Sequence, residues 1–391
     1  MKRAVSIFCA GLAFRLIAVA YLAHVKPYML SWGTNEAGGI ARWIVTNHSF
    51  SSPFHDAHGP TAWLGPAFPL IVAGIFLVFG VQTSASALAV MAFNSVCSAA
   101  TGAVVYEMGK EIHSKQAGLI AGWMWAFSLP LAILPFIPWD TSLSALALST
   151  ALLLTLRLQS GKSENWAACG AIWGGAALVN PALLVPLPIV AWLLSDHGKR
   201  CRAVLIMAIF TVILIAPWTV RNYVVFHEFM LVRSNGLAEV YFANCGFDTH
   251  PLGQSMQYQR LGEAAFTAQV NRRAAEYIRT HPMTFFHDSL RRAMLYWIYP
   301  INFWPLSVAI DLAASIGLLV AFRKSRASAF VLLGVLAVYP LIYYASQVVS
   351  RYRHPIEPVL YALSGIAVSS IIAKREVIDT HICHHCTLPD S

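Results

Sequence analysis

One carboxylate, Glu36, lies in the polar stretch Trp32-Gly-Thr-Asn-Glu-Ala-Gly-Gly-Ile-Ala-Arg-Trp, which follows the first apolar run of the chain. A carboxylate can accept the proton that a hydroxyl loses when it attacks an electrophile, so Glu36 is a candidate general base. The chain has only 18 Asp and Glu residues, and an acid at the edge of a membrane is uncommon. The alternative is an ordinary acid in the first turn of a helix, where the helix dipole favours negative charge.

A second candidate site is the turn Ser350-Arg-Tyr-Arg-His-Pro-Ile-Glu near the end of the chain. It contains Arg351, Arg353 and His354 within four residues. Arginine presents several fixed donors to an oxyanion, so this turn could bind a phosphate. The alternative is that its positive charge contacts anionic lipid headgroups.

Five further polar residues are candidates for substrate binding: His58, Asp140, Arg221, Arg233 and Glu263. Asp140 is the only charge of a short link, although it could simply start a helix. His58 belongs to His55-Asp56-Ala57-His58, whose spacing matches no standard metal site, so we predict no metal. Glu239 and Asn244 lie in the same polar region as Arg233, and their types and spacing assign them no role.

The composition determines the kind of protein in which these residues act. Of the 391 residues, 57% are hydrophobic and 12% are charged, and the mean hydropathy is +0.59. A soluble domain carries about 25% charged residues, and a disordered chain is polar, so both classes are excluded. We therefore predict an all-α polytopic membrane protein. The net charge of +9 does not by itself indicate nucleic acid, because what matters is where the positive charges lie.

Ten apolar runs approach the length of a spanning helix, which needs about 20 residues. They are residues 4–24, 83–108, 115–137, 141–158, 165–180, 181–195, 201–220, 305–322, 327–347 and 355–373. An additional run at 66–80 is shorter, and we predict a juxtamembrane helix there. The seven cysteines show no disulfide framework.

The basic residues indicate the orientation of these spans. About half of the 27 Lys and Arg residues lie in short polar links next to the apolar runs. If the number of spans is even, all these links lie on the same face of the membrane. The positive-inside rule makes that face cytoplasmic, so we predict that both termini and the tail 374–391 are cytoplasmic. Residues 25–82 and 221–304 are then two long outer segments of a single domain covering 1–391. Arg15 and Asp311 lie within spans, where charges are usually paired or functional.

Several stretches in order along the chain resemble the bacterial GT-C membrane glycosyltransferases, the group related to protein O-mannosyltransferases and to the aminoarabinose transferase of lipid A. The stretches are Asn35-Glu-Ala-Gly-Gly-Ile-Ala-Arg, Gly59-Pro-Thr-Ala-Trp-Leu-Gly-Pro-Ala-Phe-Pro-Leu, Phe79-Gly80, Trp139-Asp140, Ala216-Pro-Trp-Thr-Val-Arg-Asn-Tyr and Arg351-Tyr-Arg-His-Pro-Ile-Glu-Pro. The resemblance covers nearly the whole chain. It implies a GT-C-like bundle of about ten transmembrane helices with juxtamembrane helices in the first outer loop.

The resemblance also implies an activity. Such enzymes transfer a sugar, with inversion, from a polyprenyl-phosphate donor to a glycan, lipid or protein acceptor on the outer face of the membrane. Glu36 takes the position of their catalytic acid, although Asn35 stands where a second acid or a tyrosine is common. Arg351, Arg353 and His354 would stabilise the leaving phosphate, with Arg221 and Arg233 next. The implied setting is the bacterial inner membrane, with membrane lipids as neighbours and with neither a cofactor nor a nucleic acid as partner.

A polytopic transporter or flippase for a lipid-linked or envelope solute is the alternative function. Polar residues within spans fit it loosely, but transporters usually show paired halves, and this sequence contains no internal repeat. The sequence leaves the sugar and the acceptor open.

Overall fold

A computed structural model describes residues 2–33, 35–54, 58–195, 200–245, 251–298 and 304–385 of the chain. His55 and Asp56 lie outside these ranges, as does Cys386 of the Cys/His-rich tail. The helices of the first half are α1 (Lys2–Val25), η1 (Pro27–Leu30), α2 (Glu36–Asn47), α3 (Ala67–Phe79), α4 (Ser84–Ile112), α5 (Lys115–Ala126), α6 (Leu129–Ile133), η2 (Leu134–Phe136), α7 (Thr141–Gln159), α8 (Trp166–Val179), η3 (Pro181–Leu184) and α9 (Leu187–Leu194).

The second half continues with α10 (Cys201–Phe226), α11 (Gly236–Asn244), α12 (Pro251–Leu261), α13 (Glu263–Thr280), α14 (Pro282–Ile298), α15 (Trp304–Lys324), α16 (Arg326–Val338), α17 (Leu341–Ala345), α18 (Ser350–Arg353), η4 (His354–Ile356) and α19 (Glu357–His385). The described part of the chain thus consists of helices joined by loops, with one isolated bridge between Ser51 and Pro60. The predicted all-α class is confirmed.

Among the described residues, seven helices are long and apolar enough to cross a membrane, and an eighth span results if the bent pair α5 and α6–η2 is counted as one. The protein is therefore a multi-pass membrane protein. The segments expected at 165–180 and 181–195 are also helical, but Trp166–Val179 and Pro181–Leu194 are shorter than a full span. Helix α8 ends at Val179 because Pro181 follows, and a proline has no backbone N–H to continue the hydrogen bonds of the preceding helix. The predicted juxtamembrane segment is helix α3, of 13 residues.

The break between α5 and α6 explains the intramembrane Arg15. Its guanidinium is fully buried and donates to the carbonyl oxygens of Trp125 and Ala126, at 3.1 and 2.9 Å. A helix that ends inside a bundle leaves its last carbonyls without partners, and Arg15 satisfies two of them. Asp311 pairs with Arg353 instead, so the two intramembrane charges do not meet.

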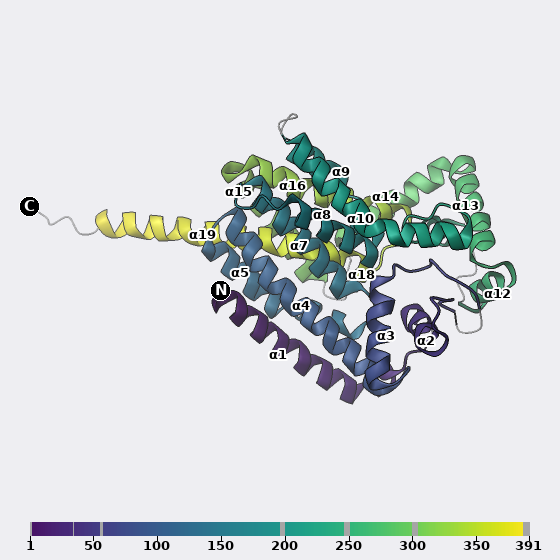
Figure 1. The fold of residues 1–391 in the computed structure, drawn as a ribbon. Helices are drawn as coiled ribbons and strands as arrows, with labels where there is room; N and C mark the ends of the chain where they lie inside the picture. The colour runs from purple at the N-terminus through teal and green to yellow at the C-terminus, as the bar shows by residue number, and fades with distance from the viewer. Residues whose placement is uncertain are drawn as a thin grey trace, which may run out of the picture.

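The helices pack closely at glycines, as is common in membranes. A Cβ atom at Gly118 of α5 would lie 2.3 Å from the carbonyl oxygen of Tyr106 in α4, so only glycine permits this approach. Figure 1 shows α1 and α4 side by side, and α19 leaves the bundle at the end where α1 begins. Helices α2, α12 and α13 lie at the opposite end.

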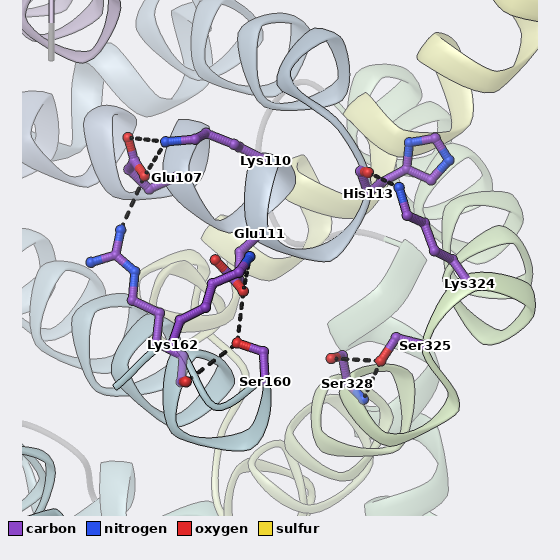
Figure 2. A network of polar contacts seen from close by, with 10 residues as sticks. Glu107, Lys110, Glu111, His113, Ser160, Lys162, Lys324, Ser325 and Ser328 are labelled. Carbon is purple, nitrogen blue, oxygen red and sulfur yellow. Dashed lines mark hydrogen bonds and ion pairs between the residues drawn. The ribbon is translucent and has the colours of Figure 1, made fainter. Parts of the chain in front are cut away.

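At the end of the bundle where α1 begins, a polar network joins several helices (Figure 2). Glu107 accepts from Lys110 and from Arg157 of α7, both at 3.0 Å, and Glu111 accepts from Lys162 at 2.8 Å. Lys324 donates to the carbonyl oxygen of His113. These residues come from the short basic links that the sequence assigned to one face, and the structure brings three of those links together.

Candidate functional site

A cavity of about 400 Å³ opens among α2, α7, α11, α17 and α18. Four of the nine predicted site residues line it: Glu36, Asp140, Arg233 and Arg351. They come from four segments far apart in the sequence. The cavity therefore contains the predicted acid and two of the predicted cations in one space.

Glu36 is placed by the start of helix α2. Asn35 caps this helix, because its side-chain oxygen accepts from the backbone N–H of Gly38 at 2.7 Å. Gly39 packs against a later part of the outer loop, where an added Cβ would be 2.4 Å from the carbonyl oxygen of Pro53. The indole of Trp63 donates to Oε1 of Glu36 at 3.2 Å. The carboxylate is thus fixed at a helix N-terminus, half-buried, and oriented toward the cavity by a hydrogen bond.

Asn35 also connects Glu36 to Asp140. Its side-chain NH₂ donates to the carbonyl oxygen of Pro138 at 3.1 Å, two residues before Asp140. Asp140 stands at the N-cap of α7, yet its side chain makes no capping hydrogen bond. Asp140 lines the cavity, where its carboxylate lies within the field of Arg233 and Arg351.

The two arginines of the cavity are oriented differently. The guanidinium of Arg351 lies 4.4 Å from the ring centroid of Trp139, a cation–π contact, and it donates to the hydroxyl of Tyr352 at 3.3 Å. Arg233 is half-buried and lies close enough to Glu36 and Asp140 for its charge to act on both. Both guanidinium groups can stabilise an anion that enters this space.

The environment raises the pKa of both carboxyl groups. Burial raises the pKa of Glu36 to about 7, and the negative charge of Glu239 adds to the effect. The charge of Arg233 and the hydrogen bond from Trp63 oppose this shift. Burial also raises the pKa of Asp140, against the charges of Arg233 and Arg351. A carboxyl group with a pKa near 7 suits general-base catalysis at neutral pH.

The sequence assigned no role to several residues that line the same cavity. Glu239 of α11, Gln347 and Asn180 supply hydrogen-bonding groups, and Trp63 and Tyr343 supply aromatic surface. The signal for Glu239 was its position as the only charge in the apolar run of α11. Tyr343 gave no such signal, because aromatic residues near span ends are common in membrane proteins.

Arg353 and His354 do not line the cavity, although they are neighbours of Arg351. Arg353 is 1% exposed and pairs with Asp311 at 2.6 Å and with Glu357 at 2.7 Å. His354 is fully buried and stacks on Trp125 with ring centroids 5.5 Å apart. The chain turns from α18 into η4 here, so adjacent side chains point in different directions. Arg351 therefore lines the cavity, whereas Arg353 and His354 make their contacts inside the helix bundle.

Glu263 and Arg221 lie outside the cavity and brace the loop that carries Trp63. Glu263 is 4% exposed and accepts from the backbone N–H of Ala62 at 2.6 Å and from the hydroxyls of Thr61 and Tyr258. Arg221 donates to the carbonyl oxygen of Thr61 at 2.7 Å. Burial raises the pKa of Glu263, and the hydrogen bonds it accepts oppose that shift. These two residues act on the site through the loop.

His58 is exposed and also lies outside the cavity, with its ring edge-on to Trp43 at 5.3 Å. In the part of the chain that the structure describes, no group of three or more His, Cys, Asp or Glu side chains is arranged to bind a metal ion.

The fold and part of the sequence are similar to known proteins. Residues 59–220 match the family model described as dolichyl-phosphate-mannose-protein mannosyltransferase. No curated protein sequence matches the chain. The oligosaccharyltransferase of Archaeoglobus fulgidus in its apo form superposes with a TM-score of 0.59 at 14% identity, covering 97% of this chain and 52% of that one. The chain has a GT-C fold.

Two further GT-C structures are similar to this chain. ArnT from Cupriavidus metallidurans bound to undecaprenyl phosphate gives a TM-score of 0.55 at 14% identity and covers 98% of this chain and 63% of that one. The Archaeoglobus fulgidus AglB complex with an inhibitory peptide and a dolichol-phosphate gives 0.56 at 14% identity, covering 99% and 52%. The chain spans about half the length of the oligosaccharyltransferases it matches.

Proposed function

We propose that this protein is an inverting glycosyltransferase that moves a sugar from a polyprenyl-phosphate donor to an acceptor at the outer face of the bacterial inner membrane. The observation that carries the proposal is the cavity that contains Glu36 together with Arg233 and Arg351. The family match over residues 59–220 and the lipid phosphates bound by two GT-C relatives support it.

In the proposed reaction Glu36 accepts the proton of the acceptor hydroxyl. The hydroxyl oxygen attacks the anomeric carbon of the donor, and the bond from that carbon to the phosphate oxygen breaks. The electron pair of that bond stays with the lipid phosphate, whose negative charge Arg351 and Arg233 stabilise. A single displacement of this kind inverts the anomeric carbon and needs no covalent intermediate on the protein.

The bundle determines how the donor reaches the cavity in this proposal. The polyprenyl tail remains in the bilayer beside the spans, and only the sugar and the phosphate enter the polar space. Both termini and the tail 374–391 then lie in the cytoplasm, with the basic links that surround Glu107 and Glu111. The acceptor, whether glycan, lipid or protein hydroxyl, enters from the side of Glu36.

The test uses the purified protein in nanodiscs and a panel of polyprenyl-phosphate sugars, with donor consumption and sugar transfer as readouts. Replacing Glu36 with Gln keeps the shape of the side chain but removes the base, so transfer should fall about 10²–10⁴-fold. Binding of undecaprenyl phosphate, followed by quenching of tryptophan fluorescence from Trp63 and Trp139, should be retained. Glu276→Gln, at an exposed acid of α13, is the matched control.

Full transfer activity in the Glu36→Gln protein would remove Glu36 from the role of base. Solute uptake into proteoliposomes by a wild-type protein that consumes no donor would favour the transporter instead.

A further inference from the structure

Glu239 lies in the cavity with both of its carboxylate oxygens already fixed by side-chain amides. Oε1 accepts from Asn235, the N-cap residue of α11, at 3.3 Å, and Oε2 accepts from Gln347 at 2.7 Å. Gln347 belongs to a different wall of the cavity, between α17 and α18. The proposed transfer reaction does not use this group.

The two walls are joined behind Glu239 by Arg292 of α14. Its guanidinium donates to the carbonyl oxygen of Ala243 and the side chain of Asn244 at the end of α11, both at 2.9 Å, and also to the carbonyl oxygens of Tyr344 and Ala345. Asn244 adds a hydrogen bond of 3.0 Å to Ala345. These hydrogen bonds fix the end of α11 to the end of α17. Glu239 and Gln347 are therefore positioned before any ligand enters.

Each carboxylate oxygen can accept more than one hydrogen bond, so Glu239 keeps acceptor capacity for a ligand. The amides of Gln347 and Asn180 add donors and acceptors to the same cavity. Trp139, Phe242 and Tyr343 add flat apolar surface. Carboxylate and amide groups beside aromatic rings are suited to a ring that bears hydroxyls on its edge and C–H groups on its faces.

We propose that Glu239, held by Gln347 and Asn235, forms a subsite that accepts hydrogen bonds from the hydroxyls of a sugar ring. The inference rests on the proposed function, because it assigns a part of the same cavity to recognition of the sugar. Glu36 and Arg351 act on the bonds that change, and Glu239 recognises a part of the ligand that does not react. The hydroxyls come from the donor sugar or from a sugar acceptor, and binding measurements distinguish these two sources.

The experiment compares undecaprenyl phosphate with a panel of undecaprenyl-phosphate hexoses and pentoses on the full-length protein in nanodiscs. Wild-type protein should bind at least one sugar-bearing carrier more tightly than the bare carrier. Glu239→Ala should lose about 10-fold or more of the affinity for that sugar-bearing carrier, because a hydrogen bond to a charged group is stronger than one between neutral groups. Its affinity for the bare carrier should stay unchanged. Gln347→Ala should show a smaller loss of the same kind, and Glu228→Ala, at an exposed acid of the same outer segment, should show none.

If the hydroxyls belong to a sugar acceptor instead, Glu239→Ala should leave the affinities for both carriers unchanged and raise the KM for the acceptor. The proposal is overturned if neither quantity changes. It is also overturned if Glu239→Ala weakens both carriers equally and lowers the unfolding midpoint, because that result identifies Glu239 as a tether between the two walls. Wild-type protein that binds neither carrier would overturn the proposed function itself.

Discussion

The indole nitrogen of Trp63 donates a hydrogen bond of 3.2 Å to Oε1 of Glu36. This bond joins the loop that Glu263 and Arg221 brace to the acid that starts α2. A hydrogen bond to a carboxylate favours its ionised form, so Trp63 opposes the burial that raises the pKa of Glu36. Trp63 therefore affects the proton affinity of the proposed base as well as its position.

The first prediction concerns the pH dependence of transfer. The pKa of Glu36 is raised to about 7, and the base acts only when it is deprotonated, so kcat/KM should decline as the pH falls through about 7. Trp63→Phe removes the hydrogen bond that lowers this pKa. The acidic limb of the profile should therefore move to higher pH. Profiles of both proteins between pH 5 and 9 test this, and an acidic limb that stays in place or moves to lower pH contradicts it.

The second prediction concerns Asn35, which both caps α2 and anchors it to Pro138. Serine is an equally good N-cap but cannot reach the carbonyl oxygen of Pro138. Asn35→Ser should therefore keep helix α2 but remove the hydrogen bond that holds the start of this helix, and with it Glu36, beside the segment that carries Asp140. We expect kcat to fall about 10-fold or more, because small displacements of a catalytic group are costly, and we expect the affinity for undecaprenyl phosphate to stay the same. Equal losses in kcat and in carrier affinity would show that Asn35 acts on the whole cavity.

The third prediction separates Arg351 from Arg353. Arg351 lies on Trp139 at the cavity, so Arg351→Ala should leave the protein folded and weaken binding of undecaprenyl phosphate. Arg353 is buried between Asp311 and Glu357, and Arg353→Ala would leave the buried Glu357 and the partly buried Asp311 without a cation. Such a loss costs about 3–5 kcal/mol, so the yield of folded protein and the unfolding midpoint should drop.

Size-exclusion profiles and thermal unfolding in one detergent compare these two variants. If Arg353→Ala folds normally and loses carrier binding, Arg353 takes part in binding the carrier and its role is not structural.

The pattern of apolar runs predicted the helices well, because each span must bury its backbone polar groups within itself. Four of the residues that the sequence pointed to line the cavity, namely Glu36, Asp140, Arg233 and Arg351, and they stood out because charges in an apolar chain are few. The sequence could not distinguish Arg351 from Arg353, because the direction of a side chain depends on the turn from α18 into η4. Nor could it find the Glu239–Gln347 contact, whose partners are 108 residues apart.

The last prediction concerns Glu263, which the sequence placed among the substrate-binding residues and which the structure places beneath the Trp63 loop. Glu263→Ala would leave the N–H of Ala62 and the hydroxyls of Thr61 and Tyr258 without their acceptor. Buried donors that lose their partner cost about 1–3 kcal/mol, so the unfolding midpoint should fall clearly, and Glu263→Gln should give a smaller drop. Thermal unfolding of both variants measures this effect. If Glu263→Ala unfolded at the wild-type midpoint but bound undecaprenyl phosphate more weakly, Glu263 would belong to substrate binding after all.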